Sequence, residues 1–137
     1  MGNTHILLVE DNEKDELLTI RALERNKVAN RIDIARDGQQ AIDYLLDTEN
    51  ELPSLVILDL KLPRLSGLEV LKHIRADART KFLPVVMLTS SDEESDINEA
   101  YQNGANSFVS KPVNIDEFTN AVRDLGLYWL ILNKAAD

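Results

Sequence analysis

Hydrophobic positions along the chain alternate between short continuous runs and a helical spacing. Continuous apolar runs predict buried strands, whereas apolar residues three and four apart predict helices that bury one face. The runs predict strands at about 5–9, 31–35, 55–58, 85–88 and 107–110. The helical spacing predicts helices at about 15–26, around 41–46, from 67 onward, before 104 and from about 114.

The helix residues expected to face the core share this spacing. They are Leu17, Ile20, Leu23, Ala41, Ile42, Leu45, Leu46, Val70, Leu71, Ile74, Ile97, Ala100 and Tyr101. Gly104 is expected to end its helix at the C′ position, where glycine is common. Asn114 is expected to cap the last helix, because Glu117 follows it three residues later as in a capping box.

Strands that alternate with helices predict a parallel sheet, since each parallel pair needs a crossover that a helix supplies. Continuous runs of Val, Ile and Leu suit strands that are covered on both faces. The predicted fold class is therefore α/β, a three-layer sandwich of five parallel strands and five helices. With 137 residues and no evident linker or repeat, residues 1–137 are expected to form one domain without an output domain.

Polar side chains follow four of the predicted strands at the point where each strand ends. Glu10 and Asp11 follow the first strand, Asp59 the third, Thr89 the fourth and Lys111 the fifth. In open α/β sheets, ligands bind in the crevice outside the carboxyl ends of the strands. The sequence therefore predicts that these side chains share one sheet edge and form the functional site.

Charge and composition exclude several classes of function. The chain has 15 basic and 24 acidic residues, and the resulting net charge of −9 argues against direct binding of nucleic acid. No cysteine is present, which excludes thiol chemistry and fits a reducing compartment. The first residues lack a signal peptide, and the longest apolar run, 127–132, is too short to cross a membrane. A cytoplasmic protein is expected.

The motifs at these strand ends resemble a known family, the receiver domain of two-component response regulators. The segment from Asp59 carries proline four residues later and glycine eight residues later, as the family does, and Lys111 is followed by Pro112. The likeness extends over almost the whole chain. It implies the strand order 2-1-3-4-5. It also implies that Asp59 accepts a phosphoryl group from a histidine kinase in a phosphorelay.

The resemblance also implies a role for each site residue. Asp11 and Asp59 would bind Mg²⁺ directly, Glu10 through water, and Lys61 through its backbone carbonyl. The residue types agree with a cation, because crowded carboxylates repel one another and Mg²⁺ prefers oxygen ligands. Lys111 and Thr89 would contact the phosphoryl oxygens.

Phe108 has two interpretations, an aromatic switch that follows phosphorylation or a plain core residue.

The resemblance to receiver domains also implies that the protein takes part in its own phosphorylation and slow autodephosphorylation but is not a turnover enzyme. A haloacid-dehalogenase-type phosphatase also uses a strand-end aspartate, but it has a second aspartate two residues later, where this chain has Lys61. An interaction module that is never phosphorylated remains an alternative.

Finer details are similar to the small regulators paired with bacterial phytochrome-type histidine kinases. The matching segments are 9–12, 37–38, 58–63, 88–91, 96–97 and 129–130. This similarity implies a sensor kinase of that type as the partner.

The last helix, at about 114–133, is unusually apolar. Phe118, Val122, Leu125, Trp129 and Leu132 have the spacing of a core-facing stripe, and Leu127, Tyr128, Leu130 and Ile131 are left on other faces. An apolar surface of this kind suggests a homodimer with contacts at Tyr128, Leu130 and Ile131. The alternative is a helix end that folds back over its own sheet.

Overall fold

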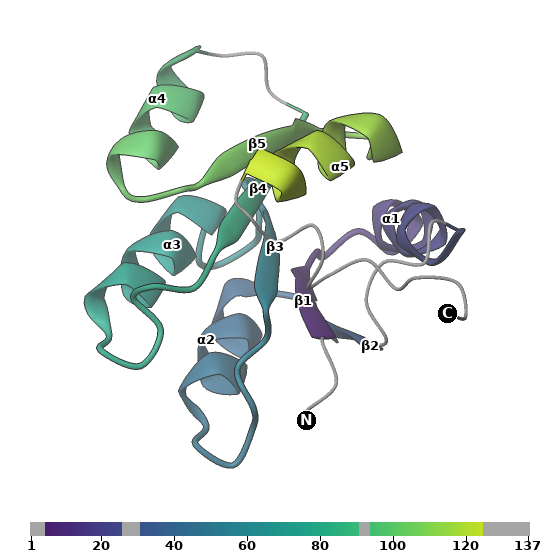
Figure 1. Ribbon diagram of the computed structural model, residues 1–137. Helices are drawn as coiled ribbons and strands as arrows, with labels where there is room; N and C mark the ends of the chain where they lie inside the picture. Colours follow the sequence, from purple (N-terminus) through teal and green to yellow (C-terminus); the bar gives the residue numbers. More distant parts are fainter. Residues whose placement is uncertain (1–4, 26–30, 91–93, 125–137) are drawn as a thin grey trace.

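The computed structural model describes residues 5–25, 31–90 and 94–124, in which strands and helices alternate (Figure 1). The strands are β1 (His5–Val9), β2 (Arg31–Ala35), β3 (Leu55–Asp59), β4 (Val85–Thr89) and β5 (Ser107–Ser110). The helices are α1 (Glu13–Arg25), α2 (Gly38–Leu46), α3 (Gly67–Ala76), α4 (Glu94–Gln102) and α5 (Ile115–Asp124). Each predicted strand is present, and β3 and β4 each extend one residue further, to Asp59 and Thr89.

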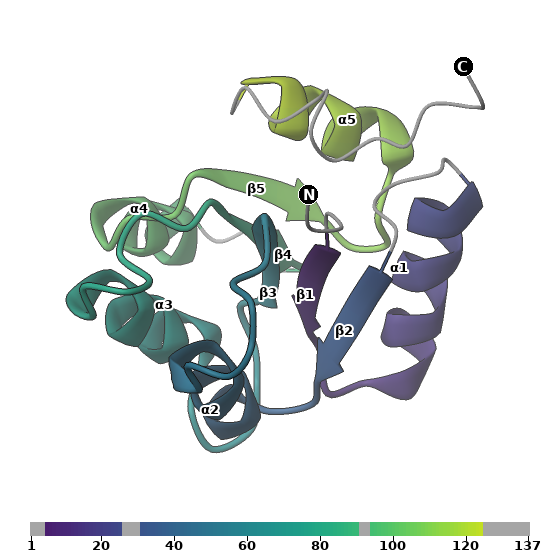
Figure 2. The ribbon, with the colours of Figure 1, turned by 60° about the horizontal axis from the view of Figure 1, so that its bottom comes forward.

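The strands form one parallel sheet in the order β2-β1-β3-β4-β5. Two apolar clusters lie on its two faces. One joins the sheet to α2, α3 and α4, and the other joins it to α1 and α5. Figure 2 shows α1 and α5 on the side of the sheet opposite α2 and α3. The predicted three-layer sandwich and strand order are confirmed.

The central strands are buried because alternate residues enter the two clusters. In β1, Leu7 and Val9 face α2 and α3, whereas Ile6 and Leu8 face α1 and α5. Every residue of β1, β3 and β4 is buried. This packing holds the carboxyl ends of the three strands at one edge.

The buried face of α1 differs from the predicted one. Leu17 was expected inside but is 48% exposed, whereas Thr19 and Leu23 are 3% and 0% exposed. The inward stripe includes the polar Glu16 and Thr19 together with Ile20 and Leu23, so Leu17 lies at its side. The helix also begins two residues early, because the Asn12 side chain accepts from the Asp15 N–H at 2.9 Å and caps it.

Two further residues expected in the core are exposed. Leu46 is 41% exposed at the last residue of α2, beyond the buried Ala41, Ile42 and Leu45. Tyr101 is 50% exposed, and its ring packs on Phe108 instead of entering the core.

The predicted capping roles of Gly104 and Asn114 are confirmed. Gly104 has φ of +99°, and its N–H and that of Ala105 donate to the carbonyls of Tyr101 and Ala100, a Schellman motif. Asn114 accepts from the Glu117 N–H at 3.0 Å. The Glu117 carboxylate accepts from the Ser110 N–H at 2.7 Å, which ties α5 to the end of β5.

The predicted last helix is described only as far as Asp124, and Phe118 within it is fully buried. Residues 125–133 of that helix, with Tyr128, Leu130 and Ile131, lie outside the described residues. Among the described helices, none has the length and apolar character needed to cross a membrane.

Candidate functional site

The strand register brings the predicted site residues to one edge of the sheet. Val9 pairs with Leu58, so Glu10 and Asp59, which follow them, lie at the carboxyl ends of neighbouring strands. Thr89 ends β4 beside Ser110 of β5, and the next N–H, that of Lys111, donates to the Thr89 carbonyl at 2.9 Å. The predicted convergence of strand ends is present.

The Lys111 ammonium lies among three carboxylates. Its Nζ is 2.7 Å from Asp59 Oδ2, 2.8 Å from Glu10 Oε1 and 3.2 Å from Asp15 Oδ2. The side chains of Glu10, Asp59 and Lys111 are 0%, 5% and 13% exposed, so water screens these charges only weakly. Lys111 is therefore the buried cation of the site, and its peptide bond to Pro112 is cis.

The site has more negative than positive charge. Burial, followed by the neighbouring Asp59, raises the pKa of Glu10 to about 7 although Lys111 opposes this shift. Glu10 Oε1 is buried without a well-directed hydrogen bond, even though it lies close to the Lys111 ammonium. Burial would lower the pKa of Lys111, but its close contacts with the Asp59 and Glu10 carboxylates outweigh burial and raise it.

Three carboxylates have the arrangement of a cation site. Glu10, Asp11 and Asp59 each offer an oxygen, and these oxygens lie within 4.8 Å of one another. Glu10 and Asp59 are buried, whereas Asp11 is exposed and open to solvent. Hard oxygen donors on one open side suit Mg²⁺, which retains several waters. Glu10 Oε1 is buried beside the Lys111 ammonium but accepts no well-directed hydrogen bond, which is a further reason why these residues fit a divalent cation.

The loop after β3 orients the Asp59 carboxylate. The Lys61 N–H donates to Asp59 Oδ1 at 3.1 Å, while Oδ2 faces Lys111. Gly67 lets α3 approach this strand end, because a Cβ there would lie 2.1 Å from the Asp59 carbonyl oxygen. A side chain at position 67 would therefore displace the backbone that carries the site.

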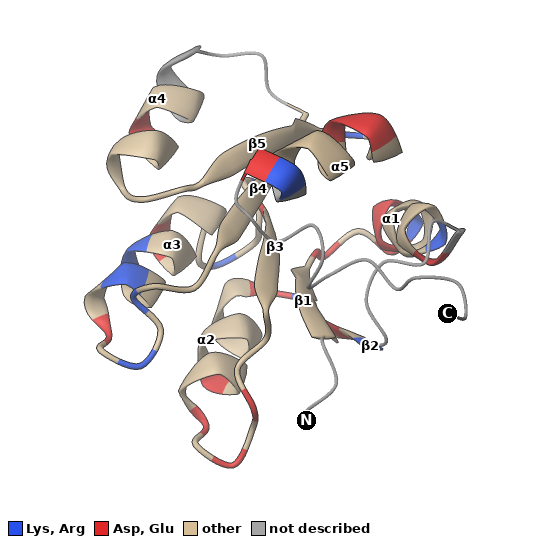
Figure 3. Ribbon diagram, viewed as in Figure 1, with Lys and Arg blue, Asp and Glu red and all other residues tan. Residues whose placement is uncertain are grey.

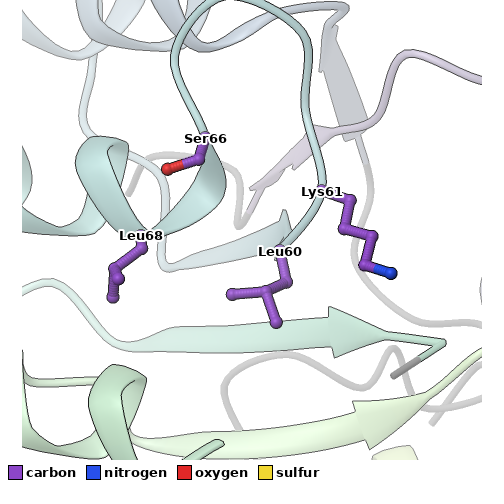
Figure 4. A pocket seen from close by; sticks show the side chains of 4 residues that line it. All are labelled: Leu60, Lys61, Ser66 and Leu68. Atoms are coloured by element: carbon purple, nitrogen blue, oxygen red, sulfur yellow. The ribbon is translucent and has the colours of Figure 1, made fainter. Parts of the chain in front are cut away.

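A pocket of about 260 Å³ lies beside this loop, lined by Leu60, Lys61, Ser66 and Leu68. Figure 4 shows that the Lys61 side chain extends away from the other three. Ser66 is engaged in a capping box with Glu69, whose N–H donates to the Ser66 hydroxyl at 3.2 Å. The pocket is thus a hollow lined by both polar and apolar residues, beside a helix start that Ser66 already caps.

The remaining predicted residues lie nearby on β4 and β5. Thr89 is 5% exposed at the end of β4. Phe108, one strand away, is half-buried against the α2–α4 side, and its ring centroid is 4.8 Å from that of Tyr101 at an interplanar angle of 60°. Phe108 thus packs partly on the core and partly on an exposed aromatic ring.

Sequence reasoning missed Asp15 as a partner of Lys111. The two residues are 96 positions apart, so no local pattern relates them. Asn12 at the cap of α1 was the available signal, because it places Asp15 in the first turn next to the end of β1. Figure 3 shows the acidic character of the segment that leads from β1 into α1.

Comparison with known proteins agrees with this geometry. The family model described as the response regulator receiver domain matches residues 6–123 of the sequence. The structure of the bacteriophytochrome response regulator AtBRR is 45% identical, with a TM-score of 0.86 over 98% of this chain and 100% of that one. The Mn²⁺-bound form of response regulator Rcp1, a protein of Synechocystis sp., is 31% identical, with a TM-score of 0.76 over 98% and 99% of the two chains.

A third relative is the probable methanogenesis regulatory protein FilR2 of Methanothrix harundinacea. It is 41% identical over 95% of this chain and 86% of its own length. The predicted likeness to phytochrome-associated regulators is confirmed by the structural relatives. With its strand order, its acidic cluster and a family model matched over most of its length, the chain belongs to the response regulator receiver domain family.

Proposed function

We propose that this chain is a cytoplasmic response regulator that accepts a phosphoryl group on Asp59 and relays the signal by changing a partner-binding surface. The observation that carries the proposal is the contact of 2.7 Å between Asp59 Oδ2 and Lys111 Nζ. It joins a buried carboxylate to the largely buried cation of the site, beside two further carboxylates. Carboxylates of this kind form aspartyl-phosphate intermediates.

The chain's own residues support phosphoryl transfer in distinct ways. Lys61 N–H and the Lys111 ammonium hold the two oxygens of Asp59, so the nucleophile is oriented before a donor arrives. As an Asp59 oxygen bonds to phosphorus, the bond from phosphorus to the donor breaks, and Lys111 neutralises charge on the transferred group. Thr89 donates its hydroxyl to a phosphoryl oxygen.

Glu10, Asp11 and Asp59 are the residues proposed to hold Mg²⁺, with the Lys61 carbonyl as a further ligand. When bound, the cation supplies positive charge that offsets the carboxylates and the incoming phosphoryl oxygens. The Mn²⁺-bound form of the relative Rcp1 supports a divalent cation here. In this function the chain is a phosphoacceptor that assists its own phosphorylation and slow autodephosphorylation, not a turnover enzyme.

Receiver domains take phosphoryl groups from histidine kinases, and the bacteriophytochrome response regulators among the relatives favour a phytochrome-type kinase as donor. Direct contact with nucleic acid or membrane is not part of the proposal, because the chain carries a net charge of −9.

The proposed switch involves Thr89, Phe108 and the surface formed by α4, β5 and α5. The phosphoryl group adds charge and acceptor oxygens at Asp59, toward which Thr89 moves. Phe108 then leaves its contact with Tyr101 and repacks inward. Phosphorylation shifts the population only as far as it contacts one state better than the other.

A homodimer through Tyr128, Leu130 and Ile131 belongs to the same proposal, on the apolar sequence of 125–132. Light scattering of the full chain is expected to give a dimer that becomes a monomer with Tyr128→Glu plus Ile131→Glu. A chain that stays monomeric at high concentration contradicts this part alone.

The phosphoacceptor is tested with a small acyl phosphate donor and Mg²⁺. The unmodified chain is expected to take up one phosphoryl label per molecule, and Asp59→Asn none. Asp33→Asn is the matched control, since Asp33 is a half-buried carboxylate on β2, two strands away from β3, and lies outside the acidic cluster. Labelling of Asp59→Asn at the level of the unmodified chain would contradict the assignment of Asp59 as the phosphoacceptor.

A further inference from the structure

The Lys111 ammonium has one partner that does not belong to the carboxylate cluster. Of its three carboxylates, Glu10 and Asp59 are members of the group that can hold a cation, whereas Asp15 is not. Asp15 comes from the first turn of α1 and is 36% exposed. We propose that Asp15 is a positioning residue, which keeps the Lys111 ammonium in the site when a divalent cation engages the other two carboxylates. This inference rests on the proposed function.

A divalent cation and Lys111 compete for the same oxygens. The ammonium lies 2.7 and 2.8 Å from oxygens of Asp59 and Glu10. A cation that takes these carboxylates repels the ammonium and removes the partners that compensate its burial. Asp15, at 3.2 Å from Nζ, is then the carboxylate that stays available. It lowers the cost of cation binding and keeps the ammonium close to Asp59.

Local structure places Asp15 for this task. The Asn12 N–H donates to Glu10 Oε2 at 3.2 Å, and the Asn12 side chain accepts from the Asp15 N–H at 2.9 Å. The Asp15 carboxylate in turn accepts from Lys111, which also donates to Asp59. Because Lys111 also forms an ion pair with Glu10, the contacts make a closed ring of four residues: Glu10, Asn12, Asp15 and Lys111. A negative charge in the first turn of a helix is also favourable in itself.

Mg²⁺ titration by calorimetry, without any phosphodonor, tests the inference. Asp15→Asn is expected to raise the Mg²⁺ dissociation constant about fivefold. Loss of a nearby negative charge would weaken Mg²⁺ binding even without Lys111. Glu13→Gln measures that general effect, because Glu13 is an exposed acid in the same helical turn. It is expected to change the dissociation constant much less than Asp15→Asn.

The decisive comparison repeats Asp15→Asn in a Lys111→Gln background. If Asp15 acts through Lys111, its effect there falls to the size of the Glu13→Gln effect. An equal loss of affinity in both backgrounds overturns the inference. Should Lys111→Gln not fold, the comparison of Asp15→Asn with Glu13→Gln decides: a clearly larger loss of affinity with Asp15→Asn supports the inference, and equal losses overturn it.

Failure of the inference is distinguishable from failure of the proposed function. If the unmodified chain binds no Mg²⁺, the proposed cation site is wrong and the inference falls with it. If the unmodified chain binds Mg²⁺ and Asp15→Asn binds it equally well, only the inference is wrong.

Discussion

Each edge of the sheet carries a polar cluster, and the two clusters differ in how well their negative charge is compensated. At the amino edge, where β1 and β2 begin, the Tyr44 hydroxyl donates to Asp33, and Arg31 binds Asp33 at 3.1 Å. His5 Nε2 lies 3.2 Å from the same hydroxyl. At the carboxyl edge, three carboxylates surround one ammonium, that of Lys111.

The pKa shifts follow this difference. Burial would raise the pKa of Asp33, but hydrogen bonds from Tyr44 and Arg31 outweigh it and lower the pKa. Burial together with the Asp33 carboxylate raises the pKa of Tyr44 to about 12, so the phenol remains a donor. In contrast, the pKa of Glu10 rises to about 7. At the amino edge the Asp33 carboxylate is balanced by Arg31 and the Tyr44 hydroxyl. At the carboxyl edge the carboxylates outnumber the single ammonium, so binding of a cation or proton is favoured there.

Removing the cation of the carboxyl edge is expected to have the largest effect on stability. Lys111→Gln leaves the buried carboxylates of Glu10 and Asp59 without their partner, and about 3 kcal/mol of unfolding free energy should be lost at neutral pH. Urea denaturation measures this loss. Lowering the pH should reduce it, because a protonated Glu10 no longer needs the ammonium.

Lys61→Gln is the matched control for this variant. Lys61 lies two residues after Asp59 but is exposed, so its substitution should change stability by less than about 0.5 kcal/mol. Equal losses for the two lysines would mean that burial of Lys111 among carboxylates contributes nothing.

Glu10 predicts a fall in stability with rising pH. Its pKa is raised from 4.5 to about 7 in the folded protein, so the unfolded chain loses this proton first. Between these values, the free energy of unfolding should decrease as pH rises, by on the order of 2 kcal/mol. Glu10→Gln removes the titrating group, and urea denaturation of the metal-free variant across this range should show a flatter profile. An unchanged slope in the variant would assign the pH dependence to other groups.

At the amino edge, Asp33 predicts the opposite pH dependence of stability. Because its folded pKa lies below the ordinary 3.8, it contributes stability above that value and loses it as pH falls through the lowered pKa. Asp33→Asn should therefore cost about 1.5 kcal/mol at pH 7, and the difference should close in acid. A difference that grows in acid would contradict the lowered pKa.

The contrast between the edges also explains what the sequence could predict. The strands were predicted to within a residue, because β1, β3 and β4 are continuous apolar runs and the shorter apolar segments of β2 and β5 alternate with helical patterns as parallel strands do. Glu10, Asp59 and Lys111 were found together because parallel strands end at one edge, so the end of each apolar run marks the site.

What the sequence did not predict depends on contacts between distant side chains. Asp15 reaches Lys111 across 96 positions, and Asp33 meets Tyr44 from a different element. In α1, Ile20 and Leu23 were predicted correctly but Leu17 was not, because the polar residues Glu16 and Thr19 lie on the inward face in its place. Hydrophobic periodicity cannot detect a polar residue that is buried because it has a partner.

The smallest predicted effect tests the hydroxyl that links His5 to Asp33. Tyr44→Phe keeps the ring but removes the donor to Asp33, so about 1 kcal/mol of unfolding free energy should be lost in urea denaturation. Tyr101→Phe is the matched control, because Tyr101 is 50% exposed and its ring contact with Phe108 does not need the hydroxyl. Phosphoryl labelling of Tyr44→Phe should equal that of the unmodified chain, since the amino edge does not supply residues to the acidic cluster. A labelling defect with unchanged stability would show that the two edges are coupled through β1 and are not independent clusters.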